Sequence, residues 1–142
     1  MNKQMTNKQR AGLCRKEYTE WKETALDTFG YFPVFQPLKE TFLLRNLSGN
    51  ALKLYLYLGL MSKNTTGETW VSLDTIAEYF GKSTRTISIW IKELEKARLI
   101  ERMQMEPNGV SHTFLKPYGW NRLHDENSLQ GKKKQRGGMC GE

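Results

Sequence analysis

A single glycine interrupts an otherwise strongly patterned part of the chain and limits how that part can fold. Residues 75–94 read TIAEYFGKSTRTISIWIKEL, and Gly81 separates two segments that carry apolar residues at helical spacing. Glycine adopts a positive φ angle without steric cost, so it allows a sharp corner between two helices. The apolar positions are Leu73, Ile76, Ala77 and Phe80 before the corner, and Ile87, Trp90, Ile91 and Leu94 after it.

The spacing around this corner predicts a helix-turn-helix. Ala77 is small enough for the two helix backbones to approach each other, and Ile87 lies one helix face beyond the turn. We expect the first helix to begin after the cap residue Ser72. The second should begin after the cap residue Ser83 and run to about Ala97.

The second helix begins with polar residues where a buried helix would carry leucine. In a helix-turn-helix this part projects into the major groove of DNA, which accounts for short or bidentate hydrogen-bonding side chains there. Arg85 can make two hydrogen bonds to guanine, a contact that discriminates by roughly 1–3 kcal/mol. An exposed Ile89 either meets a thymine methyl group or is an isolated surface residue. The candidate DNA-contacting residues here are Lys82, Ser83, Thr84, Arg85, Thr86, Ser88, Ile89 and Lys92.

β-prone segments on both sides of the helix pair predict the winged form of this fold. A short run at residues 69–71 precedes the pair, and two longer runs follow it, separated by Pro107-Asn108-Gly109. Asn-Gly between such runs is a strong hairpin signal. The hairpin tip contains Glu106, so the sequence leaves open whether the wing contacts DNA or is mainly structural. The candidate wing contacts are Arg102, Asn108, Gly109, His112 and Lys116.

The segment upstream of the winged elements predicts a helix that is apolar nearly all round. Ser48 is the expected N-cap, and residues 51–61 read ALKLYLYLGLM. Such a helix is covered on more than one side. One face can serve the domain core, and the other needs the amino-terminal helix or a second subunit.

The amino-terminal part of the chain predicts a helix with a narrow apolar stripe. Residues 1–10 are polar and expected to be mobile. In residues 12–29, apolar residues recur at gaps of four and three, the pattern of a helix-pairing seam. The alternative is a helix that folds back on its own domain. The candidate dimerisation residues are Tyr18, Trp21, Ala25 and Phe29.

An aromatic connector is expected between this helix and the apolar one. Pro33 and Pro37 exclude a regular helix through its first half and disfavour a central strand. We therefore expect an extended segment whose aromatic side chains pack on a neighbour. These side chains are Tyr31, Phe32, Phe35 and Phe42.

Together these features predict a mainly α fold with a small antiparallel β-sheet. A winged helix-turn-helix occupies residues 47–118. A flexible basic start with the helix (1–30) and the connector (31–46) precede it, and a basic, disordered tail (119–142) follows. The tail contains Lys132, Lys133, Lys134 and Arg136, which form either a solvated end or a non-specific phosphate clamp. The net charge of +7 favours polyanionic partners.

The sequence offers little support for catalysis, a metal site or a membrane segment. It has no nucleophile–base pair, and GKST at residues 81–84 lacks the upstream glycine of a phosphate-binding loop. We expect no cofactor and no metal, because His112 and His124 lack partners at ligand spacing. The longest apolar stretch is too short to span a bilayer. Cys14 and Cys140 lie near opposite ends of the chain, which favours a reducing cytoplasm over a disulfide.

The region of about residues 44–117 resembles the small winged helix-turn-helix domains of Gram-positive bacteria and their plasmids and phages. The matching pieces are Leu47-Ser48, TWVSLDTIAEYFGKSTRTI (69–87) and ELEKARLIER (93–102). The resemblance implies that residues 83–86 start the recognition helix. Ser88 and Ile89 stand where many relatives carry basic residues, so affinity would depend more on Lys82, Lys92 and the tails.

Two classes of function follow from these observations. The leading one is a sequence-specific protein that binds double-stranded DNA as a homodimer, with recognition helix 83–97 in the major groove, acting in transcriptional regulation or in plasmid or phage replication. The alternative is a winged-helix module that binds another protein in a replication or segregation complex. An enzyme is not expected. Salt discriminates between the two classes, because DNA binding weakens steeply as salt rises and an apolar interface does not.

Overall fold

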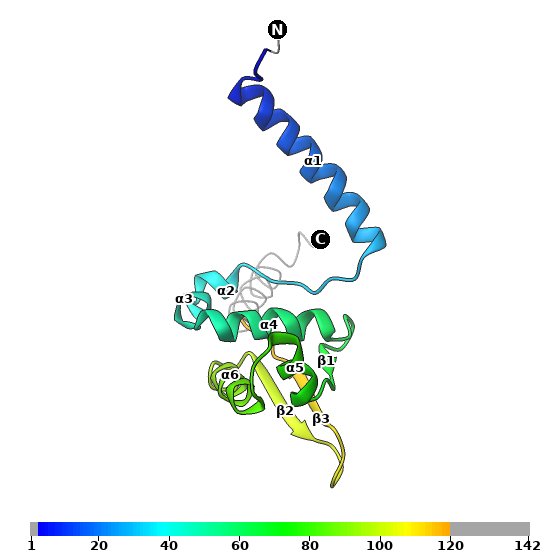
Figure 1. Ribbon diagram of the computed structural model, residues 1–142, viewed down its shortest axis with the longest axis vertical. Helices are drawn as coiled ribbons and strands as arrows, with labels where there is room; N and C mark the ends of the chain where they lie inside the picture. Colours follow the sequence, from blue (N-terminus) through cyan, green and yellow to red (C-terminus); the bar gives the residue numbers. More distant parts are fainter. Residues whose placement is uncertain (1–2, 120–142) are drawn as a thin grey trace, which may run out of the picture. The chain divides into compact units, whose positions relative to one another are not determined.

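The computed structural model describes residues 3–119, so the lysine-rich segment expected to be disordered and His124 lie outside the described residues (Figure 1). The chain divides into two compact units, with the division between Tyr31 and Phe32.

The first unit contains one long helix, α1 (Asn7–Thr28). It begins five residues before the expected start at Gly12, because Thr6 and Gln9 form a capping box: each side chain accepts a hydrogen bond from the other residue's amide. Residues 7–10, which were expected to be mobile, are part of this helix. No residue of α1 is buried, and the rings of Tyr18 and Trp21 lie 5.8 Å apart.

The second unit begins with the connector, which is only partly extended. Two short helices, α2 (Pro37–Glu40) and α3 (Leu43–Asn46), occupy the half that follows Pro37. Proline at the first helical position costs no hydrogen bond, so Pro37 starts a helix instead of preventing one.

The connector is anchored by fewer aromatic residues than expected. Phe32 packs edge-on against Tyr55 and lies so close to Gly59 that a methyl group there would overlap its ring. Leu38, which the sequence did not single out, is 4% exposed. The side chains of Tyr31, Phe35 and Phe42 are each more than half exposed, which corrects the expectation that they pack on a neighbour.

The rest of the second unit is a winged helix-turn-helix (Figure 1). Its helices are α4 (Gly49–Met61), α5 (Leu73–Phe80) and α6 (Thr84–Lys96). Its strands are β1 (Glu68–Thr69), β2 (Ile100–Gln104) and β3 (Ser111–Leu115), paired antiparallel in the order β1-β3-β2. This confirms the expected fold class, and the predicted caps Ser48, Ser72 and Ser83 each accept a hydrogen bond from a backbone amide in the first turn of their helix.

One core joins α4, α5, α6 and the inner face of the sheet. The buried stripe of α6 contains the four predicted residues, and α4 buries Leu54, Tyr55 and Leu58. The opposite side of α4 leaves Leu56, Leu60 and Met61 exposed within this unit. One apolar side of α4 is therefore covered in this unit, and the expectation that the amino-terminal helix or a second subunit covers the other side stays a prediction.

The wing is a hairpin, as predicted, and its tip is the turn from Glu106 to Gly109. The amide of Gly109 donates to the carbonyl of Glu106 (2.9 Å), and Asn108 has a φ of 63°. Proline second and a positive φ third are the features of a type II turn, so Pro107 and Asn108 are its two central residues. Figure 1 shows this hairpin extending away from the helices.

Candidate nucleic-acid interface

The corner between α5 and α6 has the geometry that Gly81 allows. Gly81 has a φ of 64°, and the amide of Lys82 donates to the carbonyl of Ala77 at 3.0 Å. Residues 81–83 form the whole turn, and Ser83 then accepts a hydrogen bond from the amide of Thr86 at 3.2 Å. Helix α6 therefore starts immediately after the corner.

The amino-terminal half of α6 presents polar side chains away from its buried stripe. Ile87, Trp90, Ile91 and Leu94 are buried, which fixes the opposite face toward solvent. Among the predicted contacts, Lys82, Ser83, Thr84, Arg85, Ile89 and Lys92 are exposed, and Thr86 and Ser88 are half-buried.

This surface combines several features that bind phosphates and base edges. No ion pair engages Lys82, Arg85 or Lys92 within residues 3–119. The first amides of α6 and its helix dipole favour an anion at the Ser83 end. Thr86 differs from the others, because its hydroxyl lies 3.0 Å from the Ser83 hydroxyl and belongs to the cap. Ile89 is 59% exposed and has no covering neighbour in the described part of the unit.

The predicted wing residues lie in a different setting, since most are engaged within the domain. Lys116 pairs with Glu101 (3.2 Å). His112 lies 3.4 Å from a Glu68 carboxylate oxygen, and its ring is flanked by the rings of Trp70 and Phe114.

Arg102 is a partly enclosed member of the predicted wing contacts. It faces Thr113 across the β2–β3 pair, and its Nη1 atom is buried. Burial lowers the pKa of the Arg102 guanidinium, and the nearby Glu95 carboxylate partly offsets this. The side chain therefore contributes mainly to the junction between the sheet and α6.

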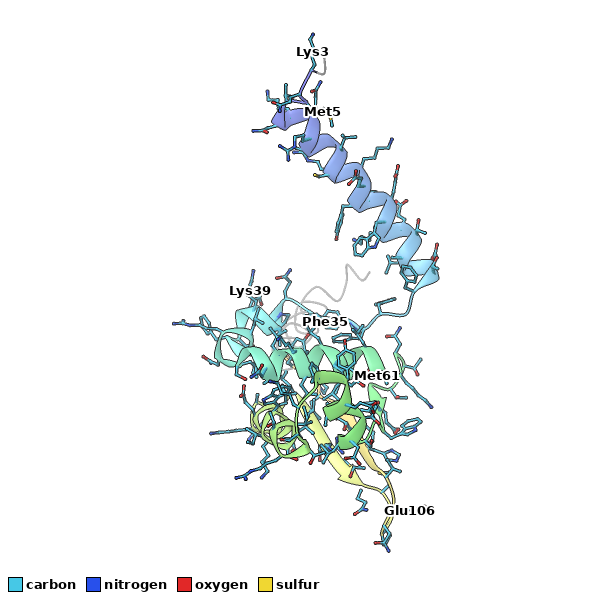
Figure 2. The ribbon with its side chains drawn as sticks, in the orientation of Figure 1. Lys3, Met5, Phe35, Lys39, Met61 and Glu106 are labelled. Carbon is cyan, nitrogen blue, oxygen red and sulfur yellow. The ribbon has the colours of Figure 1, made fainter. Side chains whose placement is uncertain are left out.

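The hairpin tip is polar but not basic. Asn108 is a central residue of the turn and Gly109 is its last residue, and the side-chain amide of Gln104 donates to the Gly109 carbonyl (2.8 Å). Figure 2 shows Glu106 at the far end of the hairpin. A carboxylate at this position opposes deep insertion between two phosphate backbones.

One contact of α6 was not anticipated from the sequence. The Glu93 carboxylate accepts two hydrogen bonds from Ser48, one from its amide (2.7 Å) and one from its hydroxyl (2.8 Å). The two residues are separated by 45 positions, so no local pattern indicates the pair.

Three of the predicted dimerisation residues lie on α1 at gaps of three and four, and the fourth, Phe29, is its C-cap residue. Trp21, Ala25 and Phe29 line a shallow groove on the first unit. Trp21 is 61% exposed, and Tyr18 and Phe29 are similarly open to solvent.

The fold and this surface define the class of the second unit: a winged helix-turn-helix, a class of domain that binds DNA through its second helix. A comparison with protein families agrees, since residues 45–100 match a family described as a helix-turn-helix domain. The matched segment runs from the end of the connector to the first residue of β2 and supports a DNA-binding domain. A search of curated proteins found no match.

Two further properties bear on the site. Within residues 3–119, no three acidic, histidine or cysteine side chains are grouped so that they could hold a metal ion. No helix in the same range has both the length and the apolar character needed to cross a membrane.

Proposed function

We propose that this chain is a sequence-specific protein that binds double-stranded DNA, with α6 in the major groove. One observation carries the proposal: the polar amino-terminal half of α6 is exposed opposite a fully packed apolar stripe. In this arrangement Arg85 is the base-reading residue, and Thr84 and Ser88 contribute shorter contacts. Lys82, Lys92 and the first amides of α6 contact phosphates.

The wing has a smaller part in this proposal. A phosphate contact by Lys116 or His112 requires each side chain to exchange its present carboxylate partner. Arg102 would have to leave an enclosed position. Asn108 is exposed at the tip and can approach the DNA backbone through its side-chain amide, whereas the Gly109 amide already donates to the Glu106 carbonyl. For these reasons the wing contributes less to the proposed affinity for DNA than α6 does.

We propose further that the protein acts as a homodimer through α1. An isolated helix gains little stability in water, and a helix with no buried residue gains from pairing. Tyr18, Trp21, Ala25 and Phe29 supply the seam. A dimer would set two copies of α6 about one helical turn of DNA apart, on the order of 34 Å.

The resemblance to plasmid and phage proteins of Gram-positive bacteria favours a cytoplasmic role in transcriptional regulation or replication. The basic tail would add a phosphate clamp whose strength depends on salt. One winged scaffold serves all these tasks, so the target DNA decides among them.

A second function, docking of another protein, is favoured by a different observation. The outer side of α4 exposes Leu60 and Met61, and Tyr79 of α5 is 68% exposed beside Tyr57. An apolar surface of this kind fits a protein partner in a replication or segregation complex.

Selection of bound fragments from a random duplex library, at two salt concentrations, tests the proposed function. A DNA-reading protein enriches one motif, and its affinity falls steeply as salt rises. If no motif is enriched at either concentration, α6 is not a reading helix and the protein-docking function is favoured.

A further inference from the structure

Helix α6 is attached to the domain by two different kinds of contact. Its apolar stripe packs on α4 and the sheet. Apolar contacts are non-directional. They therefore determine which face of α6 points inward, but they fix the exact rotation about the helix axis less firmly. The contact between Glu93 and Ser48 is directional, because both carboxylate oxygens are engaged at 2.7 and 2.8 Å.

The same contact ties α6 to the N-cap of α4. The Ser48 hydroxyl donates to Glu93 and accepts from the amide of Ala51 (3.1 Å), so it links the carboxylate to the first turn of α4. The positive end of the α4 dipole and its free amides favour a carboxylate there. The negative charge of Glu93 therefore faces the N-terminus of α4, although Glu93 is part of α6, the helix proposed to approach the phosphates of DNA.

Accurate base reading depends on such a constraint. Functional groups must be held to within about 0.5 Å of their working geometry. Arg85 and Glu93 lie eight positions apart in one helix, which corresponds to about 12 Å along the axis. A change in the rotation of α6 at Glu93 therefore moves the Arg85 side chain relative to the rest of the domain.

We propose that Glu93 is a positioning residue for DNA recognition: its paired hydrogen bonds to the N-cap of α4 set the orientation from which α6 reads base edges. This inference rests on the proposed function and adds to it a residue that need not touch DNA. It predicts that loss of the contact harms discrimination between sequences more than it harms general affinity for DNA.

The test measures the affinity of the full chain for the selected duplex and for an unrelated duplex, at one salt concentration where each variant is folded by circular dichroism. Glu93→Gln keeps the shape but replaces one acceptor with a donor. Glu95→Gln makes the same charge change on α6 without a hydrogen bond to α4. Tyr118→Phe removes a hydrogen bond of similar length, to the amide of Phe35 (2.7 Å), in another part of the unit.

We expect Glu93→Gln to lower the ratio of specific to non-specific affinity about tenfold, while Glu95→Gln and Tyr118→Phe keep it within twofold. Ser48→Thr retains the hydroxyl, so it should also keep this affinity ratio within twofold. Ser48→Ala should lower the ratio as Glu93→Gln does. Ser48→Ala also decides the matter if Glu93→Gln does not fold.

An unchanged ratio in both Glu93→Gln and Ser48→Ala, or an equal loss in the two controls, would overturn the positioning role. The proposed function would still stand in that case if the wild-type protein selects a sequence and Arg85→Ala relaxes the preference. A wild-type protein that prefers no sequence would overturn both proposals together.

Discussion

The amide of Lys82 donates a hydrogen bond to the carbonyl oxygen of Ala77, five residues earlier, at 3.0 Å. This bond closes the end of α5 and is possible because Gly81, between them, has a φ of 64°. Because α6 starts two residues after Lys82, the conformation of Gly81 sets the direction in which α6 leaves the corner.

Replacement of Gly81 by alanine is expected to destabilise the domain by roughly 1–2 kcal/mol, the cost of a left-handed conformation for a residue with a β-carbon. The added methyl group meets no atom within 4 Å, so conformational strain alone is measured. Gly49→Ala is the matched control, because that position is equally open but lies in the first turn of α4. Urea denaturation should show it to be neutral or slightly stabilising. Equal stability of the two variants would contradict the strain argument.

Features determined by neighbouring residues could be predicted from the sequence. The caps Ser48, Ser72 and Ser83 each depend on an amide three residues away. The corner depends on Gly81 alone. The start of α1 could also have been found, because Thr6 and Gln9 have the spacing of a capping box.

Features set by distant contacts could not be predicted. Leu38 is buried because the connector folds onto the domain, and nothing near it in the sequence distinguishes it from Leu44. The packing of Phe32 on a neighbour was expected, but its position depends on the absence of a side chain at Gly59, 27 positions later, which no local pattern indicates.

Arg85 provides the most direct test of the reading surface. Arg85→Ala should weaken binding to the selected duplex by about 1–3 kcal/mol and relax the preference at one base pair, because the bidentate contact to guanine is lost. Arg85→Lys keeps the charge but not the planar fork, so it should relax the preference while retaining affinity for unrelated DNA. Fluorescence anisotropy with a set of single-base variants of the duplex measures both effects.

If Arg85→Ala leaves both the affinity and the preferred sequence unchanged, the assignment of α6 as the reading helix is wrong.

At the candidate interface, too, features set by neighbouring residues could be predicted from the sequence, and features set by distant contacts could not. The exposed polar start of α6 follows from its own apolar period, which the sequence contains in full. The engagement of Lys116 with Glu101 and of His112 with Glu68 depends on strand register, which the sequence did not specify. A shift of one residue in that register would have reversed which side chains face the core.

Self-association through α1 predicts a specific effect of Trp21. Trp21→Ala removes the largest exposed ring of the stripe and should shift the protein from dimer toward monomer in sedimentation equilibrium, as buried aromatic area is lost. Glu23→Ala, an exposed change off the stripe, should leave the association constant nearly unchanged. A wild-type protein that is monomeric at tens of micromolar would refute pairing through α1.

Tyr55 is expected to make stability fall at high pH. Its side chain is 2% exposed, and burial, followed by the neighbouring Tyr118 phenol, raises its pKa well above the ordinary value. The folded state therefore keeps the proton under conditions in which the unfolded phenol, with a pKa of about 10, loses it. The raised pKa of Tyr55 makes its full contribution to stability below about pH 10. As the pH rises from there toward the pKa of Tyr55 in the folded protein, the free energy of unfolding falls by up to about 1.4 kcal/mol per pH unit.

Urea denaturation at pH 8 and pH 11 measures this loss. Tyr55→Phe has no proton to lose, so its free energy of unfolding should decrease by about 1 kcal/mol less than that of the wild type over the same interval. Tyr18→Phe removes a phenol from an exposed position and should behave like the wild type. An identical decrease in the wild type and in Tyr55→Phe would mean that the phenol of Tyr55 ionises as easily in the folded protein as in the unfolded chain.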